Sequence, residues 1–208
     1  MATQPIVYVV DDDASVRKSL ERLIKTEGLS VRAFASARDF LVGELPDTPA
    51  CLLLDIEMPE ITGLELQEQL TTRHQSLPIV FITGFGNVPK SVQAMKAGAF
   101  DFLEKPFEAA TLIAAIHRAI NHDIQVRERN RELAATQKRM ANLTNREREV
   151  FELVVTGMLN KQIAFQLGIA EKTIKVHRSR IMQKMGAQSL AELVRLAERS
   201  HNPTHLSL

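Results

Sequence analysis

The stretch that decides the fold of this chain is Cys51-Leu52-Leu53-Leu54-Asp55-Ile56-Glu57-Met58-Pro59-Glu60-Ile61-Thr62-Gly63. Four residues suited to a buried strand lead directly into a carboxylate, and Pro59 and Gly63 interrupt the chain before an amphipathic segment begins. A continuous apolar run is typical of a central parallel strand, because helices cover both of its faces. Ligands of open parallel sheets bind beyond the carboxyl ends of the strands, so Asp55 is a candidate site residue. A lone aspartate in this place is more often only a helix cap or turn residue.

Four further short apolar runs resemble strands, and segments with the spacing of amphipathic helices separate them. Besides the strand that ends at Asp55, the predicted strands are 6–10, 30–34, 78–83 and 100–103. The predicted helices are 15–26, 36–45, 63–71 and 88–97. Strands that alternate with helices favour a parallel, doubly wound α/β sheet of five strands.

Length and composition allow two modest domains or one large domain. The chain has 208 residues, of which 45% are hydrophobic and 25% are charged, as in an ordinary globular protein. No apolar run reaches the roughly 18 residues that suggest a membrane span. The first residues lack the basic region and apolar core of a secretory signal, and the single cysteine, Cys51, allows no internal disulfide. We therefore expect a cytoplasmic protein.

The net charge of +1 conceals an asymmetry between the two parts of the chain. Residues 138–208 carry twelve basic and six acidic side chains, whereas residues 1–137 carry fourteen and nineteen. An acidic first part suggests metal or phosphate chemistry, and a basic second part suggests a polyanionic partner.

A long segment that contains neither proline nor glycine follows the last predicted strand. Residues 108–120 are amphipathic and residues 121–141 are largely polar, so we expect one long helix that ends the first domain and continues as a linker. A solvated, partly frayed segment is the alternative. The predicted division is a first domain at 1–121, a helical linker at 122–141 and a second domain at 142–208.

Four helices are predicted in the second domain. Thr144 and Glu147 form a capping box at the start of the first, which ends at Gly157. Helices at 161–167 and 170–185 surround Leu167-Gly168-Ile169-Ala170 with the spacing of a helix-turn-helix, and 189–198 forms the last.

Polar residues follow the predicted strands of the first domain at one edge of the sheet. These are Asp11 and Asp12 after the first strand, Asp55, Thr83 and Lys105. Three neighbouring carboxylates repel one another unless a cation lies among them, and Mg²⁺ prefers such oxygen ligands. The set predicts a phosphoryl acceptor site, with Asp55 as nucleophile and Thr83 and Lys105 binding phosphoryl oxygens.

Motifs that occur in order over residues 5–120 resemble the receiver domain of response regulators. They are Val-Val-Asp-Asp-Asp, Leu-Leu-Asp-Ile-Glu-Met-Pro, Ile-Thr-Gly and Glu-Lys-Pro-Phe, with the intervals between them. The resemblance implies a flavodoxin-like strand order of 2-1-3-4-5 and a cis Lys105-Pro106 bond. It implies that Asp12, Asp55 and the Glu57 carbonyl bind Mg²⁺ directly and Asp11 through water. Asp13 is then a helix cap, and Phe102 is an aromatic switch that turns inward when Thr83 moves to the phosphoryl group.

The second domain resembles the LuxR-type helix-turn-helix, and the whole chain is similar to the NarL/FixJ class of response regulators, in its FixJ-type branch. The motifs are Lys161-Gln162-Ile163-Ala164, Leu167-Gly168-Ile169 and Lys172-Thr173-Ile174-Lys175-Val176-His177. The expected DNA-binding residues are Lys161, Lys172, Thr173, Lys175, Val176, His177, Arg178, Ser179, Arg180 and Lys184. Lys175 and Val176 are candidate base readers, while Lys161, Lys172, Arg178 and Lys184 are candidate phosphate contacts. Each cation alone could equally be a solvated charge. Ala170 departs from the family, which often has a serine or threonine cap there.

The resemblance implies a regulator of transcription whose phosphorylation at Asp55 by a histidine kinase controls dimerisation and binding to double-stranded DNA, with RNA polymerase as a further partner. It implies no enzyme activity beyond slow loss of the phosphoryl group. Glu57 and Phe85 are expected to overhang the pocket and set the lifetime of that group. The alternatives are a phosphatase or phosphomutase, and a DNA-binding protein with a degenerate receiver. Kinase, operator and direction of regulation do not follow from the residues.

Overall fold

The computed structural model describes residues 4–43, 45–73, 75–84 and 88–201. It forms two compact units, Met1–Arg127 and Glu128–Leu208. Their boundary falls inside the predicted linker 122–141, so a linker that is separate from both domains stays a prediction.

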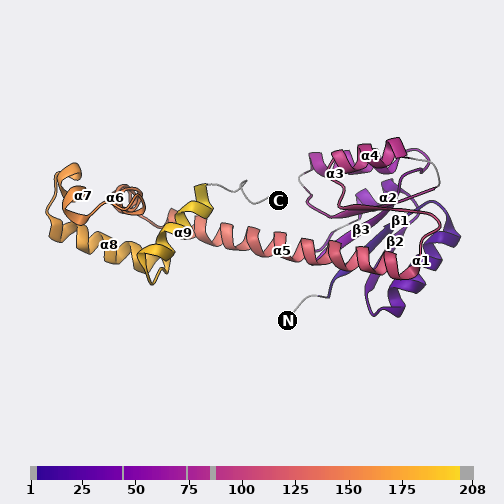
Figure 1. Ribbon diagram of the computed structural model, residues 1–208, viewed down its shortest axis with the longest axis horizontal. Coiled ribbons are helices and arrows are strands. Elements are labelled where there is room, and N and C mark those ends of the chain that lie inside the picture. The colour runs from indigo at the N-terminus through magenta and orange to yellow at the C-terminus, as the bar shows by residue number, and fades with distance from the viewer. Residues whose placement is uncertain (1–3, 44, 74, 85–87, 202–208) are drawn as a thin grey trace. The chain divides into compact units, whose positions relative to one another are not determined.

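The first unit contains one parallel sheet, as the alternation of strands and helices predicted (Figure 1). Its strands are β1 (Ile6–Val10), β2 (Ser30–Phe34), β3 (Ala50–Asp55), β4 (Ile79–Thr83) and β5 (Asp101–Glu104). Their order is β2-β1-β3-β4-β5, the flavodoxin-like order. The central strand β3 is buried along its whole length, which explains its unbroken apolar sequence.

Helices cover both faces of the sheet and form two cores. On one face lie α2 (Ala37–Val42), α3 (Gly63–Thr72) and α4 (Val88–Lys96), and on the other lie α1 (Ala14–Thr26) and the first part of α5 (Ala109–Ala141). Alternate residues of β3 face alternate cores, since Leu52 and Leu54 pack in the first and Cys51 and Leu53 in the second. The predicted helix at 36–45 ends too late, since α2 ends at Val42, where Gly43 takes an extended conformation.

The helix α5 is continuous over 33 residues, as the absence of proline and glycine predicted. Leu112, Ile116 and Ile120 on its first part are buried against the sheet. Its last part belongs to the second unit, where Thr136 is buried and the guanidinium of Arg139 donates to the Met185 carbonyl at 3.2 Å. Among the described residues, no helix is both long and apolar enough to cross a membrane.

The second unit adds α6 (Asn145–Val155), α7 (Asn160–Leu167), α8 (Glu171–Met185) and α9 (Leu190–His201). Its core combines Val150 and Phe151 of α6 with Ile163 of α7 and Ile174 and Ile181 of α8. These contacts confirm the inward face that the sequence predicted for α8. Gly168, with φ of 64°, closes α7 in the left-handed conformation and allows the tight turn into α8.

An ion pair between the buried Glu147 and the more exposed Lys184 reinforces the start of α6. The predicted capping box is present, because Thr144 accepts from the Glu147 amide and Glu147 accepts from the Thr144 amide. The Glu147 carboxylate also lies 2.6 Å from Lys184 Nζ. The hydrogen bond from Lys184, followed by that from the Thr144 amide, lowers the pKa of Glu147 to about 2.

We expect acid to remove the stabilisation that this ion pair provides. A carboxylate with a lowered folded-state pKa stabilises the fold fully above its ordinary pKa of 4.5, and the contribution is lost as pH falls towards 2. Lys184→Met should therefore lower the free energy of unfolding by about 1–3 kcal/mol near neutral pH, and its difference from wild type should vanish towards pH 2. Urea unfolding followed by circular dichroism measures both values, and Lys172→Met, at an exposed position, is the control. A difference that does not change with pH would contradict the assignment to Glu147.

Candidate phosphoacceptor pocket and DNA-binding face

Four of the predicted pocket residues meet at the carboxyl edge of the sheet. Asp55 ends β3, Thr83 ends β4, Asp11 follows β1 and Lys105 follows β5. The side chains of Asp11, Asp55 and Thr83 are buried, with at most 8% of each residue exposed. The topology therefore brings together groups that are up to 94 residues apart in the sequence.

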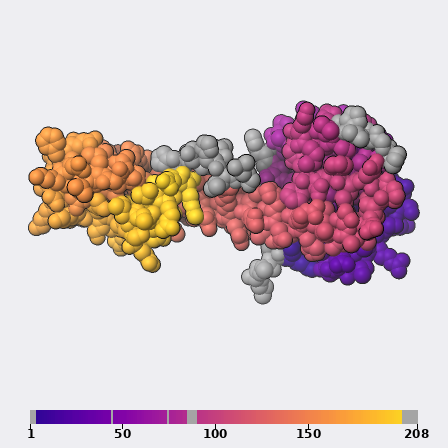
Figure 2. Space-filling view, viewed as in Figure 1, coloured from indigo at the N-terminus to yellow at the C-terminus, as the bar shows by residue number. Residues whose placement is uncertain are grey.

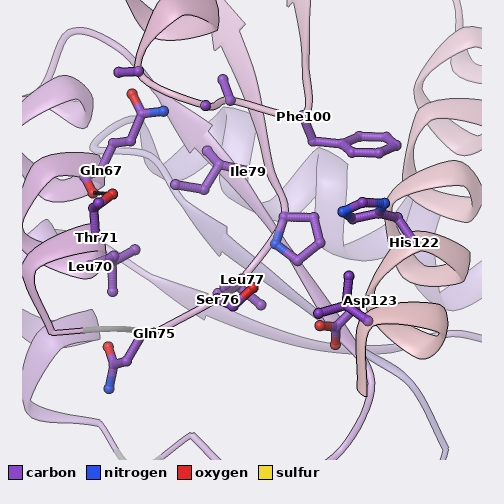
Figure 3. Close-up of a pocket in the computed structure, with 15 residues that line it drawn as sticks. Gln67, Leu70, Thr71, Gln75, Ser76, Leu77, Ile79, Phe100, His122 and Asp123 are labelled. Atoms are coloured by element: carbon purple, nitrogen blue, oxygen red, sulfur yellow. Dashed lines mark hydrogen bonds between the residues drawn. The ribbon is translucent and has the colours of Figure 1, made fainter. Parts of the chain in front are cut away.

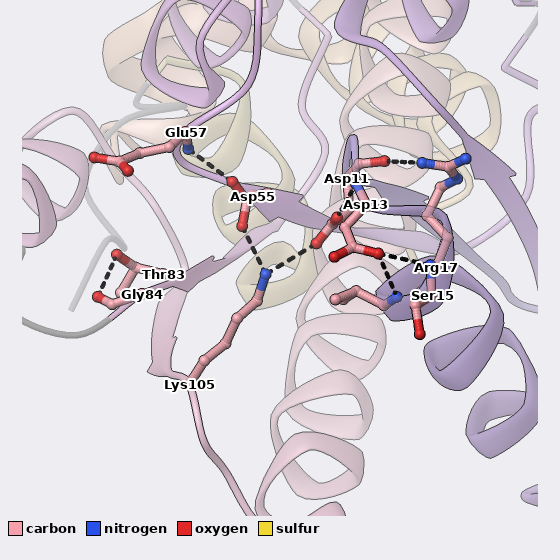
Figure 4. Close-up of polar contacts among 10 residues, drawn as sticks. Asp11, Asp13, Ser15, Arg17, Asp55, Glu57, Thr83, Gly84 and Lys105 are labelled. Carbon is pink, nitrogen blue, oxygen red and sulfur yellow. Dashed lines mark hydrogen bonds and ion pairs between the residues drawn. The ribbon is translucent and has the colours of Figure 1, made fainter.

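Lys105 lies between the two buried carboxylates (Figure 4). Its Nζ atom is 2.8 Å from Asp55 Oδ1 and 3.0 Å from Asp11 Oδ2. The second oxygen of Asp55 accepts from the Glu57 amide at 2.8 Å, and Asp11 Oδ1 accepts from the Asp13 amide at 2.8 Å. Each carboxylate is thus held by one main-chain amide and one shared ammonium.

Burial and charge act in opposite directions on the ionisation of this pair. Burial raises the pKa of Asp55 above its ordinary value, while the hydrogen bond and charge of Lys105 lower it in part. Burial also lowers the pKa of Lys105, but hydrogen bonds to Asp55 and Asp11 outweigh this and leave that pKa raised. The ammonium therefore keeps its proton, and the pocket carries a fixed positive charge beside Asp55.

The backbone around the pocket is also explained by its residues. Asp13 caps α1 as predicted, since its carboxylate accepts from the Ser15 and Val16 amides, and these bonds lower its pKa. A side chain at Gly63 would place its Cβ only 2.3 Å from the Asp55 carbonyl oxygen, so only glycine fits there. The Lys105-Pro106 bond is cis, as expected.

Two of the three predicted carboxylates, those of Asp11 and Asp55, lie together at Lys105, and convergence of the third stays a prediction. Asp12 is exposed, and the part of the chain that the structure describes contains no group of three acidic, histidine or cysteine side chains arranged around a common metal position. The single ammonium of Lys105 contacts both Asp11 and Asp55 and offsets part of their charge. The donor chemistry still fits Mg²⁺, because two buried carboxylates, a main-chain carbonyl and an adjacent exposed carboxylate are all hard oxygen ligands.

The two residues of the expected switch, Thr83 and Phe102, both line one hollow beside α4. The Thr83 hydroxyl donates to the Gly84 carbonyl at 3.2 Å, and Phe102 is 41% exposed. This mainly apolar hollow of about 320 Å³ separates them, with Val92 and Met95 of α4 among its lining residues. Glu57, two residues after Asp55, pairs with Lys90 of α4 at 2.7 Å. Phe85 lies outside the described residues.

The predicted DNA-binding face of α8 is exposed over most of its length. The exposed members are Lys172, Thr173, Lys175, Val176, Ser179 and Arg180, and Lys161 of α7 is also exposed. Ile174, Ile181 and Met185 are buried on the opposite side of α8. Ala170 caps α8 with its main chain only, as its residue type predicted.

Three of the expected DNA contacts have partners within the unit, and one of them is Lys175, which pairs with Glu171 at 3.6 Å. Arg178 donates to the Asn160 side chain at 3.0 Å, and Lys184 donates to the Asn142 carbonyl at 3.1 Å besides pairing with Glu147. His177 is half-buried, and its Nδ1 atom is enclosed without a hydrogen-bond partner among the described residues. Arg178 and Lys184 thus contribute to the packing of the unit, and their contacts with phosphates stay a prediction.

A further hollow of the first unit is not part of this pocket. It measures about 620 Å³ and lies at the amino ends of β4 and β5, the opposite edge of the sheet from Asp55 (Figure 3). The ring of His122 lies against Phe100 beside it, with ring centres 5.3 Å apart.

Sequence reasoning missed a buried ion cluster at the same amino edge. Asp123 is 1% exposed, accepts from the Ala50 amide at 2.8 Å and pairs with Arg127 Nε at 2.7 Å, while Arg127 also pairs with Asp47. Asp123 and Arg127 continue the face of α5 that carries Ile116 and Ile120. This helical spacing could have indicated that they face the core.

Comparisons with known proteins agree with this arrangement. Residues 7–117 match the family described as "Response regulator receiver domain", and residues 141–197 match "Bacterial regulatory proteins, luxR family". The chain is 45% identical to Nodulation protein W of Bradyrhizobium diazoefficiens, with 95% of this chain and 87% of that protein aligned. It is 44% identical to the transcriptional regulatory protein FixJ of Azorhizobium caulinodans, over 92% and 90%. A solved structure of the response regulator StyR aligns with a TM-score of 0.85 and 46% identity, over 95% of this chain and 100% of that one.

Proposed function

Because this chain belongs to the response-regulator family of the NarL/FixJ type, with a receiver and a LuxR-type DNA-binding domain, we propose that phosphorylation of Asp55 controls its DNA binding. Proteins of this family regulate transcription in two-component systems and are not catalysts, which excludes the phosphatase and phosphomutase alternatives. The observation that carries the proposal is the buried Asp55 carboxylate held 2.8 Å from the Lys105 ammonium.

The pocket supplies most of what phosphoryl transfer requires. An Asp55 oxygen attacks the phosphorus of a phosphorylated histidine in the kinase. The P–N bond breaks, and its electron pair and a proton go to the imidazole nitrogen. Lys105 is placed to neutralise the charge on the transferred group, and the Thr83 hydroxyl is free to exchange Gly84 for a phosphoryl oxygen. Asp11, Asp12, Asp55 and the Glu57 carbonyl would hold Mg²⁺, which supplies further neutralisation of phosphoryl oxygens.

We propose that the exposed face of α4 and β5 pairs with a second copy of the receiver after phosphorylation. Val92, Met95 and Phe102 are 47%, 43% and 41% exposed there, and the outer side of α4 reaches the surface (Figure 2). Inward rotation of Phe102 would fill the hollow beside Thr83 and reshape this face. Pairing would bring two α8 helices to half-sites about one DNA turn apart.

The α8 face provides the proposed DNA surface. Lys175 and Val176 are exposed and suited to a guanine edge and a thymine methyl group, and Lys161 and Lys172 are exposed cations for phosphates. The cytoplasm, where a kinase, DNA and RNA polymerase are all reachable, is the proposed location.

Two substitutions in the second unit should distinguish residues that contact DNA phosphates from residues that contact base edges. Lys161→Ala should lower the slope of log affinity against log salt by about 0.9 and weaken all DNA sequences alike, because one phosphate contact is lost. Lys175→Ala should instead remove about 1–3 kcal/mol of preference at one base pair. Fluorescence anisotropy on an operator and its single-base variants measures both effects.

The same titrations, with and without a small phosphodonor, test the proposed function. Phosphorylation should tighten binding of the wild type, and sedimentation should show a dimer. Equal affinity in both states would contradict control by Asp55. Identical behaviour of the Lys161 and Lys175 variants would contradict the division between readers and positioners.

A further inference from the structure

Arg17 holds the main chain of the acidic loop. It is the fourth residue of α1 and half-buried, and its Nη1 atom donates to the Asp11 carbonyl oxygen at 2.7 Å (Figure 4). We propose that Arg17 is a positioning residue of the phosphoacceptor pocket, which orients the peptide between Asp11 and Asp12 and so directs the Asp12 carboxylate towards the Mg²⁺ position. This inference rests on the proposed function of the pocket.

With the hydrogen bond from Arg17 included, each polar group of Asp11 has a partner. Its amide donates to the Phe34 carbonyl at 3.4 Å, its Oδ1 accepts from the Asp13 amide, and its Oδ2 contacts Lys105. Arg17 occupies the remaining acceptor, the carbonyl oxygen. Every polar group of Asp11 therefore has a partner, and the peptide that joins it to Asp12 is held at the carbonyl.

Asp12 depends on that peptide for its direction. Its side chain is exposed, and within the described ranges no hydrogen bond or ion pair holds its carboxylate. The backbone alone therefore sets the region that this carboxylate samples. Fixing the preceding carbonyl narrows that region without occupying the carboxylate, which remains available as a metal ligand.

The location of Arg17 argues against two simpler roles. A cation near a helix N-terminus is unfavourable with respect to the helix dipole, so stability of α1 alone does not explain an arginine there. Three carboxylates lie in the adjacent loop, yet in the part of the chain described by the structure none of them is within ion-pair distance of Arg17. The guanidinium donates a directed hydrogen bond to a carbonyl. Such contacts are typical of residues that do not bind the metal themselves but orient the side chains that do.

The experiment compares Mg²⁺ binding by the unphosphorylated full-length protein in three variants of Arg17. Titration calorimetry with MgCl₂ alone gives the dissociation constant without any need for phosphorylation. Arg17→Ala should weaken binding about ten-fold or more, as losses of such supporting partners do. Arg17→Gln and Arg17→Lys keep a donor and should recover part of the loss. Lys18→Ala removes an exposed neighbouring cation from α1 and should leave binding unchanged.

The outcomes separate this inference from the function on which it rests. Unchanged or tighter Mg²⁺ binding in Arg17→Ala, with wild-type protein that binds Mg²⁺ and labels Asp55, would overturn the role of Arg17 alone. Glutamine behaving like alanine while lysine behaves like wild type would show a charge effect and would also overturn it. Wild-type protein that binds no Mg²⁺ and accepts no phosphoryl group would overturn the proposed function, and this inference with it.

Discussion

Asp55→Asn should abolish covalent labelling of the protein by a small phosphodonor in the presence of Mg²⁺. Asp55 is the buried carboxylate at the end of β3 that lies 2.8 Å from Lys105, and an amide oxygen is too weak a nucleophile to replace it. The substitution keeps the shape of the side chain and one oxygen that can accept from the Glu57 amide or Lys105. The fold should therefore persist while the reaction is lost.

The measurement is intact-protein mass spectrometry, which detects the added phosphoryl group directly. Asp39→Asn, an exposed carboxylate in α2, serves as the matched control and should label like wild type. Undiminished labelling of Asp55→Asn would show that another residue accepts the phosphoryl group. The loss should also remove the effect of the phosphodonor on DNA affinity while the basal affinity remains.

Arg127→Leu should destabilise the first unit by about 3–5 kcal/mol, because it leaves the buried Asp123 carboxylate without its counter-ion. Asp123 is 1% exposed and also holds the first amide of β3, that of Ala50. The pair therefore ties α5 to the strand that carries Asp55 at its other end. Lys25→Leu is the control, since the Lys25–Glu21 pair has the same spacing but is exposed and should contribute only about 0.3–0.5 kcal/mol.

The unfolding of the first unit can be followed by itself. Tyr8 is the only tyrosine of the sequence, which has no tryptophan, and it is buried in the core of that unit. Its fluorescence during urea unfolding therefore reports on the first unit alone. Adding Asp123→Asn to Arg127→Leu should restore part of the stability, because the amide still accepts from Ala50 but carries no charge. A change below about 1 kcal/mol, the range of exposed pairs, would contradict the buried-charge argument.

The sequence by itself determined the elements of both units and the main pocket residues. Apolar runs marked β1, β3 and β4, and helical spacing marked α5 and the buried side of α8. These signals are local, because burial of one face imposes a period of two or 3.6 residues on neighbouring positions. The topology of parallel strands then placed Asp11, Asp55, Thr83 and Lys105 at one edge.

Only the tertiary structure decided which polar groups are paired. Nothing local shows that Asp123 holds an amide 73 residues away, that Lys184 pairs with Glu147, or that Asp12 faces solvent. A charged side chain has the same local pattern whether it is solvated or paired across the core. Its state depends on which distant groups packing brings within about 3 Å, and that distance is a property of the assembled fold.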